Sequence, residues 1–284
     1  MRLLAISDLH LSHAINRKAL LDIPDHGDDW LIVAGDTAEG LADQEFALCE
    51  LAKRFAKLVW VPGNHDLWAV PRKGKTVLRG EARYRALVEI ARSHGAVTPE
   101  DPFPYWPGPD PCDGARRVIA PLFLLYDYSF RPYDVPRGDV RLWAREKRSV
   151  CADELWLHPE PHESRDAWCV ERCKVAEQRL MDIPEDTRLI LVNHWPMRHE
   201  LIRIPRAPRF TPWCGTMLTR YWHARFRAEV VVSGHLHMRR TDWIDGCRFE
   251  EVSLGFPGQW RQDLGIAHYF REIIGIAKMV GGIP

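Results

Sequence analysis

The sequence lacks three features that would each assign it to a broad class of proteins. Its 39 lysines and arginines balance 39 aspartates and glutamates, so bulk charge indicates neither nucleic acid nor a membrane surface as partner. Its seven cysteines form an odd set without a Cys-x-x-Cys pair, which argues against a disulfide framework. No apolar run could span a bilayer, and the one before Asp8 is too short for a signal peptide. We therefore expect a cytoplasmic protein with reduced thiols and no membrane partner.

The sequence does contain five short apolar runs that each end in aspartate, asparagine or histidine. With the polar residues that follow them, they are 3–10, 30–36, 58–66, 189–194 and 230–237. Continuous aliphatic and β-branched runs of this length are typical of strands buried on both faces. In such sheets, ligands gather outside the carboxyl ends of the strands. The five polar clusters are therefore predicted to converge on one edge.

Each cluster alone has an ordinary structural explanation. Asp8 or Asp36 could cap the next helix, Gly63 could serve a turn, and Asn64 could occupy a left-handed turn position. A single histidine after a strand is more often a hydrogen-bonded residue than a metal ligand. Five such clusters, all rich in oxygen and imidazole donors, favour a metal site.

The chain is predicted to form one α/β domain over residues 1–284, with loop or lid insertions around 99–117 and 134–163. Asp8, Asp36 and Asn64 stand 28 residues apart, about the length of one strand-helix-strand unit. Periodicity and capping residues predict helices at 43–57, 81–94 and 164–181, a strand at 118–126 and antiparallel strands within 240–252.

The motifs D-x-H, G-D, G-N-H-D, N-H and G-H-x-H, spread from Asp8 to His237, resemble those of the calcineurin-like metallophosphoesterase superfamily. The resemblance implies a four-layer α/β/β/α sandwich with two mixed sheets. It also implies two metal ions, the first held by Asp8, His10 and His237, the second by Asn64, His194 and His235, with Asp36 as the bridge.

The same resemblance assigns a catalytic role to His65. This residue would bind the substrate phosphate and protonate the leaving oxygen, with Asp66 orienting its ring. Turn chemistry in Gly-Asn-His-Asp is the alternative explanation for His65.

The donor set itself indicates the kind of metal. Carboxylates, imidazoles and an amide oxygen together suit manganese, iron or zinc better than calcium or magnesium. The donors are too many for one tetrahedral ion, so two divalent transition-metal ions with a bridging hydroxide are expected.

The substrate is predicted from an arginine-rich segment. Residues 195–240 contain nine arginines and two glutamates, interleaved with aromatic residues that could stack on bases. Arg206 and Arg209 are candidate substrate-binding residues. Asn193 could also bind substrate, although a capping role fits it equally. A solvated basic surface is the competing interpretation of the arginines.

These patterns predict a binuclear metal-dependent phosphodiesterase for nucleotide or single-stranded nucleic-acid substrates. A small-molecule phosphomonoesterase is the nearest alternative. A non-catalytic protein-binding scaffold with the same fold is an alternative of another class, although a scaffold has no physical need for the full set of metal-binding residues.

Overall fold

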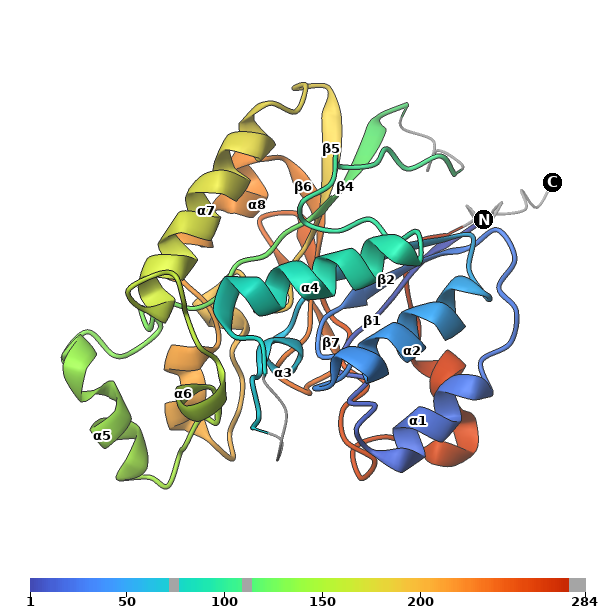
Figure 1. Cartoon of the computed structure of the whole chain (residues 1–284). Coiled ribbons are helices and arrows are strands. Elements are labelled where there is room, and N and C mark those ends of the chain that lie inside the picture. The colour runs from blue at the N-terminus through green and yellow to red at the C-terminus, as the bar shows by residue number, and fades with distance from the viewer. Residues whose placement is uncertain (72–76, 109–113, 276–284) are drawn as a thin grey trace.

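A computed structural model describes residues 1–71, 77–108 and 114–275 of the chain, and within them the strands form two mixed sheets (Figure 1). The first sheet has the order β3-β2-β1-β9, with β9 antiparallel to β1 and the other pairs parallel. The second has the order β4-β5-β6-β8-β7, with only β7 antiparallel to its neighbour. The strands are β1 Leu3–Ile6, β2 Trp30–Ala34, β3 Lys57–Val61, β4 Arg116–Pro121, β5 Thr187–Val192, β6 Ala228–Ser233, β7 Arg240–Ile244, β8 Cys247–Glu251 and β9 Arg271–Ile274.

The alternation of side chains along each strand separates the layers. In β1, Leu3 and Ala5 pack with Ile190 of β5 in the core between the two sheets. Leu4 and Ile6 point to the opposite face and join the core that lies beneath the helices. Both faces of β1 are therefore buried, which explains why its sequence is continuously apolar.

Helices cover the outer face of each sheet, so the predicted four-layer sandwich is confirmed (Figure 1). The helices α1, α2 and α4 lie along the first sheet, whereas α7 and α8 lie along the second. The helices are α1 Ala14–Leu21, α2 Leu41–Ala52, α3 Asn64–Leu67, α4 Gly80–Ser93, α5 Val140–Arg145, α6 Asp153–Trp156, α7 Arg165–Met181 and α8 Trp222–Arg225.

Short 3-10 helices occupy the connections. They are η1 Arg137–Asp139, η2 His199–Leu201, η3 Pro208–Trp213, η4 Met217–Thr219, η5 Gln262–Leu264 and η6 Ile266–Tyr269. Among the described residues, no helix combines the length and apolar character that crossing a bilayer requires. The six described cysteines carry free thiols, and Cys112 lies outside the described residues.

Three predicted elements match the structure closely. The helix predicted at 81–94 is α4, and Gly95 follows it with a φ of +73°. The helix predicted at 164–181 is α7, where the Ser164 hydroxyl accepts a hydrogen bond from the Ala167 N–H at 3.1 Å. The pair β7 and β8 forms the predicted antiparallel hairpin.

Two predicted boundaries are wrong. The helix expected at 43–57 ends at Ala52, because Lys57 already pairs with Trp30 as the first residue of β3. The strand expected at 118–126 ends at Pro121. Beyond it the chain leaves the ladder, since the Leu124 N–H bonds to the Asn193 side chain at 2.9 Å. In both places apolar residues continue in the sequence beyond the last residue of the element. The pattern alone therefore does not mark where the helix or the strand ends.

The two expected insertions differ in character. Residues 134–163 hold η1, α5 and α6, helices too short to leave a periodic pattern in the sequence. In the segment 99–117, Tyr105 forms an isolated bridge with Val118. Residues 109–113 of that segment lie outside the described part of the chain.

Candidate metal centre

The loops that follow β1, β2, β3, β5 and β6 meet at one edge of the sandwich. Five predicted ligands in these loops have a positive φ, namely Asp8, His10, Asp36, His235 and His237. A non-glycine residue in this region stores backbone strain, of order 1–3 kcal/mol each. Such strain persists only where the surrounding structure holds it, and here it is concentrated at the sites of the candidate donors.

Glycines allow the loops to approach one another closely. A Cβ atom on Gly35 would lie 2.7 Å from both His194 Nδ1 and the Gly63 nitrogen. A Cβ atom on Gly234 would overlap the side chains of Ser7 and Asp8. The glycines of the G-D and G-H-x-H motifs are therefore required by contacts between loops rather than by turn geometry alone.

The first group of donors is Asp8, His10 and His237. The Nε2 atom of His237 lies 3.0 Å from Asp8 Oδ1 and 3.1 Å from His10 Nε2. His10 Nε2 is 3.7 Å from the same Asp8 oxygen. Donors bound to one ion at about 2.0–2.2 Å are separated from each other by roughly 3.0–3.6 Å. These three atoms therefore have the spacing that a single shared cation requires.

The second group is Asn64, His194 and His235. Asn64 Oδ1 lies 3.2 Å from His194 Nε2 and 3.0 Å from His235 Nδ1. The carboxylate of Asp36 lies 3.4 Å from His194 Nε2. His235 Nε2 is buried and has no hydrogen-bond partner within residues 1–71, 77–108 and 114–275, and Nδ1 is the atom that faces the other donors. The spacing again fits one shared cation.

Asp36 connects the two groups. Its carboxylate, with Asp8 and His194, forms a set of donors that lie within 4.8 Å of one another, and it forms a second such set with His10 and His65. The side chain of Asp36 is 2 % exposed, so it offers its oxygens to the interior of the site. All seven predicted ligands are thus brought together.

Hydrogen bonds outside the donor groups orient two of the rings. His194 Nδ1 lies 2.9 Å from the Ala34 carbonyl oxygen, so this nitrogen donates and Nε2 is the atom that faces the centre. His237 Nδ1 lies 2.7 Å from Gln259 Oε1, which also accepts the Phe256 N–H. Outer partners of this kind fix the tautomer of a metal-binding imidazole.

The buried carboxylates of the site favour positive charge on the groups beside them. Burial lowers the pKa of His194, but the Asp36 carboxylate outweighs it and raises the value to about 10. Burial also lowers the pKa of His237, but the Asp8 carboxylate outweighs this effect and raises the value to about 9. Burial lowers the pKa of His235 to about 3. Protons on two imidazoles therefore balance the buried carboxylates, and divalent cations can replace them.

His65 is held between the centre and Glu39. Its Nδ1 atom lies 3.0 Å from Glu39 Oε1, and its ring packs on Trp68 with centroids 3.6 Å apart. The Nε2 atom is 4.0 Å from Asp36 Oδ2 and so faces the donors. Burial lowers the pKa of His65, but Asp36 and the Glu39 hydrogen bond raise it above its usual value. Glu39 follows Asp36 by three residues, which is the only local signal of its role.

The expected contact between Asp66 and the His65 ring is wrong. Asp66 Oδ2 instead accepts the N–H groups of Asp36 and Gly63 at 2.9 and 2.8 Å, and Oδ1 accepts the Ala38 N–H at 3.0 Å. The Asp66 carboxylate therefore ties the loop after β2 to the loop after β3. The motif correctly marks a buried carboxylate but does not reveal whether its partner is a ring or the backbone.

Asp153, which the sequence analysis did not identify, orients Asn64. Its side chain is fully buried, and Oδ1 accepts hydrogen bonds from Asn64 Nδ2 at 2.9 Å and from Trp68 Nε1 at 2.6 Å. Asp153 Oδ2 has no hydrogen-bond partner in the described part of the chain. The amide nitrogen of Asn64 is thus directed toward α6, which leaves its oxygen toward His194. No local sequence pattern predicts this contact, because 89 residues separate the two side chains.

The proposed substrate residues are placed differently from the donors. Asn193 uses both ends of its amide within the protein, accepting from the Leu124 N–H and donating to the Trp195 carbonyl at 2.7 Å. Arg209 pairs with Glu146 at 2.6 Å. Arg206 is exposed. Asn193 therefore holds the chain after β4, whereas the two arginines belong to a surface beside the centre.

Comparisons with known proteins find a matching family model and a relative that is similar over most of the chain. A family model described as calcineurin-like phosphoesterase matches residues 1–239. The chain is 45% identical over 260 residues to the acyl-carrier-protein phosphodiesterase PptH of Mycobacterium tuberculosis, covering 91% of this chain and 79% of that protein. The crystal structure of a phosphopantetheinyl hydrolase (PptH) from the same organism superposes with a TM-score of 0.88 at 41% identity, covering 99% of this chain and 98% of the other.

Proposed function

The chain belongs to the calcineurin-like phosphoesterase family, and we propose that it hydrolyses the phosphodiester that joins a phosphopantetheinyl group to an acyl carrier protein. The family and the relative make the chain a metal-dependent phosphoester hydrolase rather than a protein-binding scaffold. The observation that carries the substrate proposal is the 45% identity over 91% of this chain to a protein named for that activity.

The residues at the carboxyl edge of the two sheets fit two divalent ions. Asp8, His10 and His237 would hold one, and the second would be held by Asn64, His194 and His235, with Asp36 between them. The mixed nitrogen and oxygen donors favour manganese, iron or zinc. When bound, the two ions would offset the negative charge of the phosphodiester and lower the pKa of water.

His65 is proposed to donate a proton to the leaving oxygen. Its Nε2 atom faces the donor groups while Nδ1 is held by Glu39. The alkoxide of a serine or other alcohol is a poor leaving group, so a positioned acid accelerates its departure by about 10²–10⁴-fold. Hydrolysis then leaves a free hydroxyl on the carrier and a phosphomonoester on the released group.

The nucleotide preference expected from the arginine-rich segment has less support than the carrier-protein substrate. Arg209, one of the two arginines on which it rested, is engaged with Glu146. Nucleotide-type diesters therefore enter the test as comparison substrates.

The proposal is tested with carrier protein that bears the phosphopantetheinyl group. Metal-loaded enzyme should convert it to the unmodified carrier and free phosphopantetheine, both detected by mass spectrometry. A bis-nitrophenyl phosphate, a nitrophenyl monoester, cyclic nucleotides and a short oligonucleotide are assayed in parallel, with Asp36→Asn as the inactive control. If nucleotides are cleaved while the modified carrier stays intact, the proposed substrate is wrong and only the assignment as a phosphodiesterase remains.

A further inference from the structure

Positive charge is concentrated on one surface of a chain that is neutral overall. We define the basic face as residues 131–150 and 198–209. The first segment has six cationic side chains against three acidic ones, and the second has four arginines against one glutamate. The remainder of the chain must therefore carry the compensating negative charge, and the basic face is a local feature of the fold.

The two segments of the basic face are in direct contact. Arg209, in η3, pairs with Glu146 just after α5, and its guanidinium lies 4.7 Å from the centre of the Trp143 ring. A groove of about 750 Å³ lies where the segments meet and is lined by Phe130, Arg131, Pro132, Trp143, Lys147, His199, Pro208, Arg209 and Thr211. The exposed cations of both segments are thus presented on one surface, whereas Arg198 is buried and pairs with Glu200 and Asp245.

Several cations of the basic face have no partner among the described residues. Arg145, Lys147, Arg148 and Arg206 are exposed, and none of their side chains forms a hydrogen bond or ion pair with another described residue. Cations of the same face that do have partners, such as Arg209, are less free to bind another molecule. The four unpaired side chains leave positive charge available to an anionic surface.

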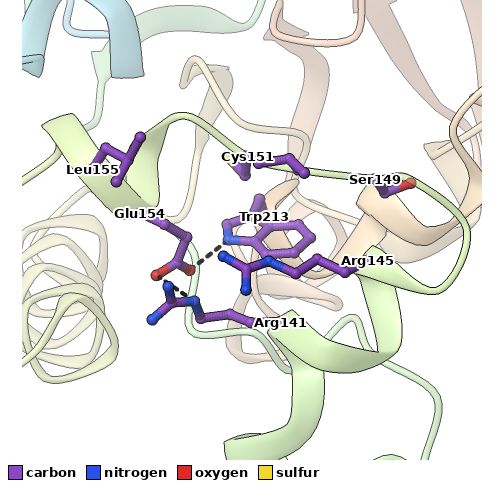
Figure 2. Close-up of a pocket in the computed structure, with 8 residues that line it drawn as sticks. Arg141, Arg145, Ser149, Cys151, Glu154, Leu155 and Trp213 are labelled. Atoms are coloured by element: carbon purple, nitrogen blue, oxygen red, sulfur yellow. Dashed lines mark hydrogen bonds and ion pairs between the residues drawn. The ribbon is translucent and has the colours of Figure 1, made fainter.

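Apolar side chains are exposed beside these cations. Leu142, Val150 and Leu155 are 63%, 65% and 60% exposed. Val150 and Leu155 line a hollow of about 60 Å³ together with Arg141 and Arg145, and Figure 2 shows both arginines extending from α5 toward Trp213 and Glu154. Exposed apolar groups mixed with arginine are typical of protein interfaces, whereas a solvated surface needs only the charges.

The basic face is joined to the metal centre by packing. The ring of Phe210, in η3, stacks on His235 at 6.0 Å between centroids. Glu154 of α6 accepts a hydrogen bond from Trp213 Nε1 at 2.8 Å, and the neighbouring Asp153 holds Asn64. A partner on the basic face would consequently lie next to the loops that hold the scissile phosphate.

We propose that the basic face is the docking surface for an acidic face of the carrier protein. This inference rests on the proposed function and adds how the protein part of the substrate is recognised. A metal centre can attract any phosphodiester, so a complementary charged surface is needed to select one macromolecule. Unpaired cations would steer and orient a negatively charged carrier, while the exposed leucines and valine would exclude water at its surface.

The test compares two triple charge reversals of equal size. Arg145→Glu/Lys147→Glu/Arg148→Glu alters the basic face, and Lys18→Glu/Lys174→Glu/Arg188→Glu alters exposed cations elsewhere. The first variant should lower kcat/KM for a carrier of net negative charge at least about 10-fold, mainly through KM, and the loss should shrink as salt rises. Activity toward bis-nitrophenyl phosphate should be unchanged in both variants.

Carrier binding is measured separately from carrier hydrolysis. The two measurements distinguish an error in the docking surface from an error in the proposed function. Labelled carrier is titrated against wild type, both variants and Arg206→Glu, a single reversal in the other segment. An intact carrier after incubation with wild type would refute the proposed function alone. Equal carrier affinity in wild type and the basic-face variants would overturn the docking surface. Tighter binding of an oligonucleotide, lost in those variants, would assign the face to nucleic acid and also overturn it.

Discussion

The loops at the metal edge and the two segments of the basic face both concentrate ionisable side chains, but they hold them in different environments. At the metal edge, carboxylates and imidazoles are buried or half-buried and held by contacts within the protein, as Asp66 is by three backbone N–H groups. On the basic face, several arginines and Lys147 are exposed, and four of these cations have no partner among the described residues. The difference is consistent with our proposal that the loops after the strands hold the chemistry and that the basic face docks the carrier protein.

Removing the residue between the donor groups should have the largest effect. Asp36→Ala deletes a carboxylate that lies within reach of both groups, so we expect loss of bound metal and of hydrolysis of every phosphoester. Elemental analysis of the purified protein measures the metal. Metal content equal to that of wild type would contradict the position between the two ions.

His65→Ala should abolish proton donation without emptying the site. We expect metal content close to that of wild type and a loss of about 10²–10⁴-fold in turnover. The loss should be smaller for a nitrophenyl ester, since nitrophenolate departs without protonation. Equal losses for good and poor leaving groups would show that His65 acts on the phosphate rather than on the leaving oxygen.

Asp153 tests whether the insertion contributes to the metal edge. Asp153→Leu removes the acceptor that holds Asn64 Nδ2, so the amide can rotate and present its NH₂ group to the metal. We expect metal affinity to fall by about 10–100-fold, the usual scale for an outer partner. Asp153→Asn keeps an acceptor oxygen in place and should restore the affinity. Two variants of equal affinity would indicate a merely structural role.

Glu39→Ala should have an effect of similar or smaller size on turnover alone. The substitution removes the acceptor that holds Nδ1 of His65. The ring therefore loses one of the contacts that fix its orientation. A decrease of about 10-fold, at the lower end of the range for an outer partner, is expected with unchanged metal content. Steady-state kinetics combined with elemental analysis would detect it, and a variant that loses metal would instead place Glu39 in the support of the donors.

The smallest effect is expected on the basic face itself. Arg206→Ala removes an exposed side chain, so the free energy of unfolding should change by no more than about 0.5 kcal/mol and small diesters should be hydrolysed as before. Arg209→Ala serves as the matched variant, because it also removes the pairing with Glu146 and the stacking on Trp143. Chemical denaturation of both proteins measures the difference.

Much of the metal edge was predictable because its signals are local. Asp8, Asp36, Asn64, His194 and His235 each lie two or three positions after the last residue of a strand, and parallel strands end on the same side of a sheet. Strand pattern and motif were therefore enough to predict that these side chains meet. The resemblance to the family rests on the same motifs.

The partners of these side chains were decided only by tertiary packing. Glu39 rather than Asp66 holds the His65 ring, and Asp153 reaches Asn64 from an insertion without periodicity. Asn193 was expected near substrate but secures the chain after β4. A hydrogen bond between distant segments depends on which loops the folded sheets bring together, and that information is not contained in the spacing of residues along either segment.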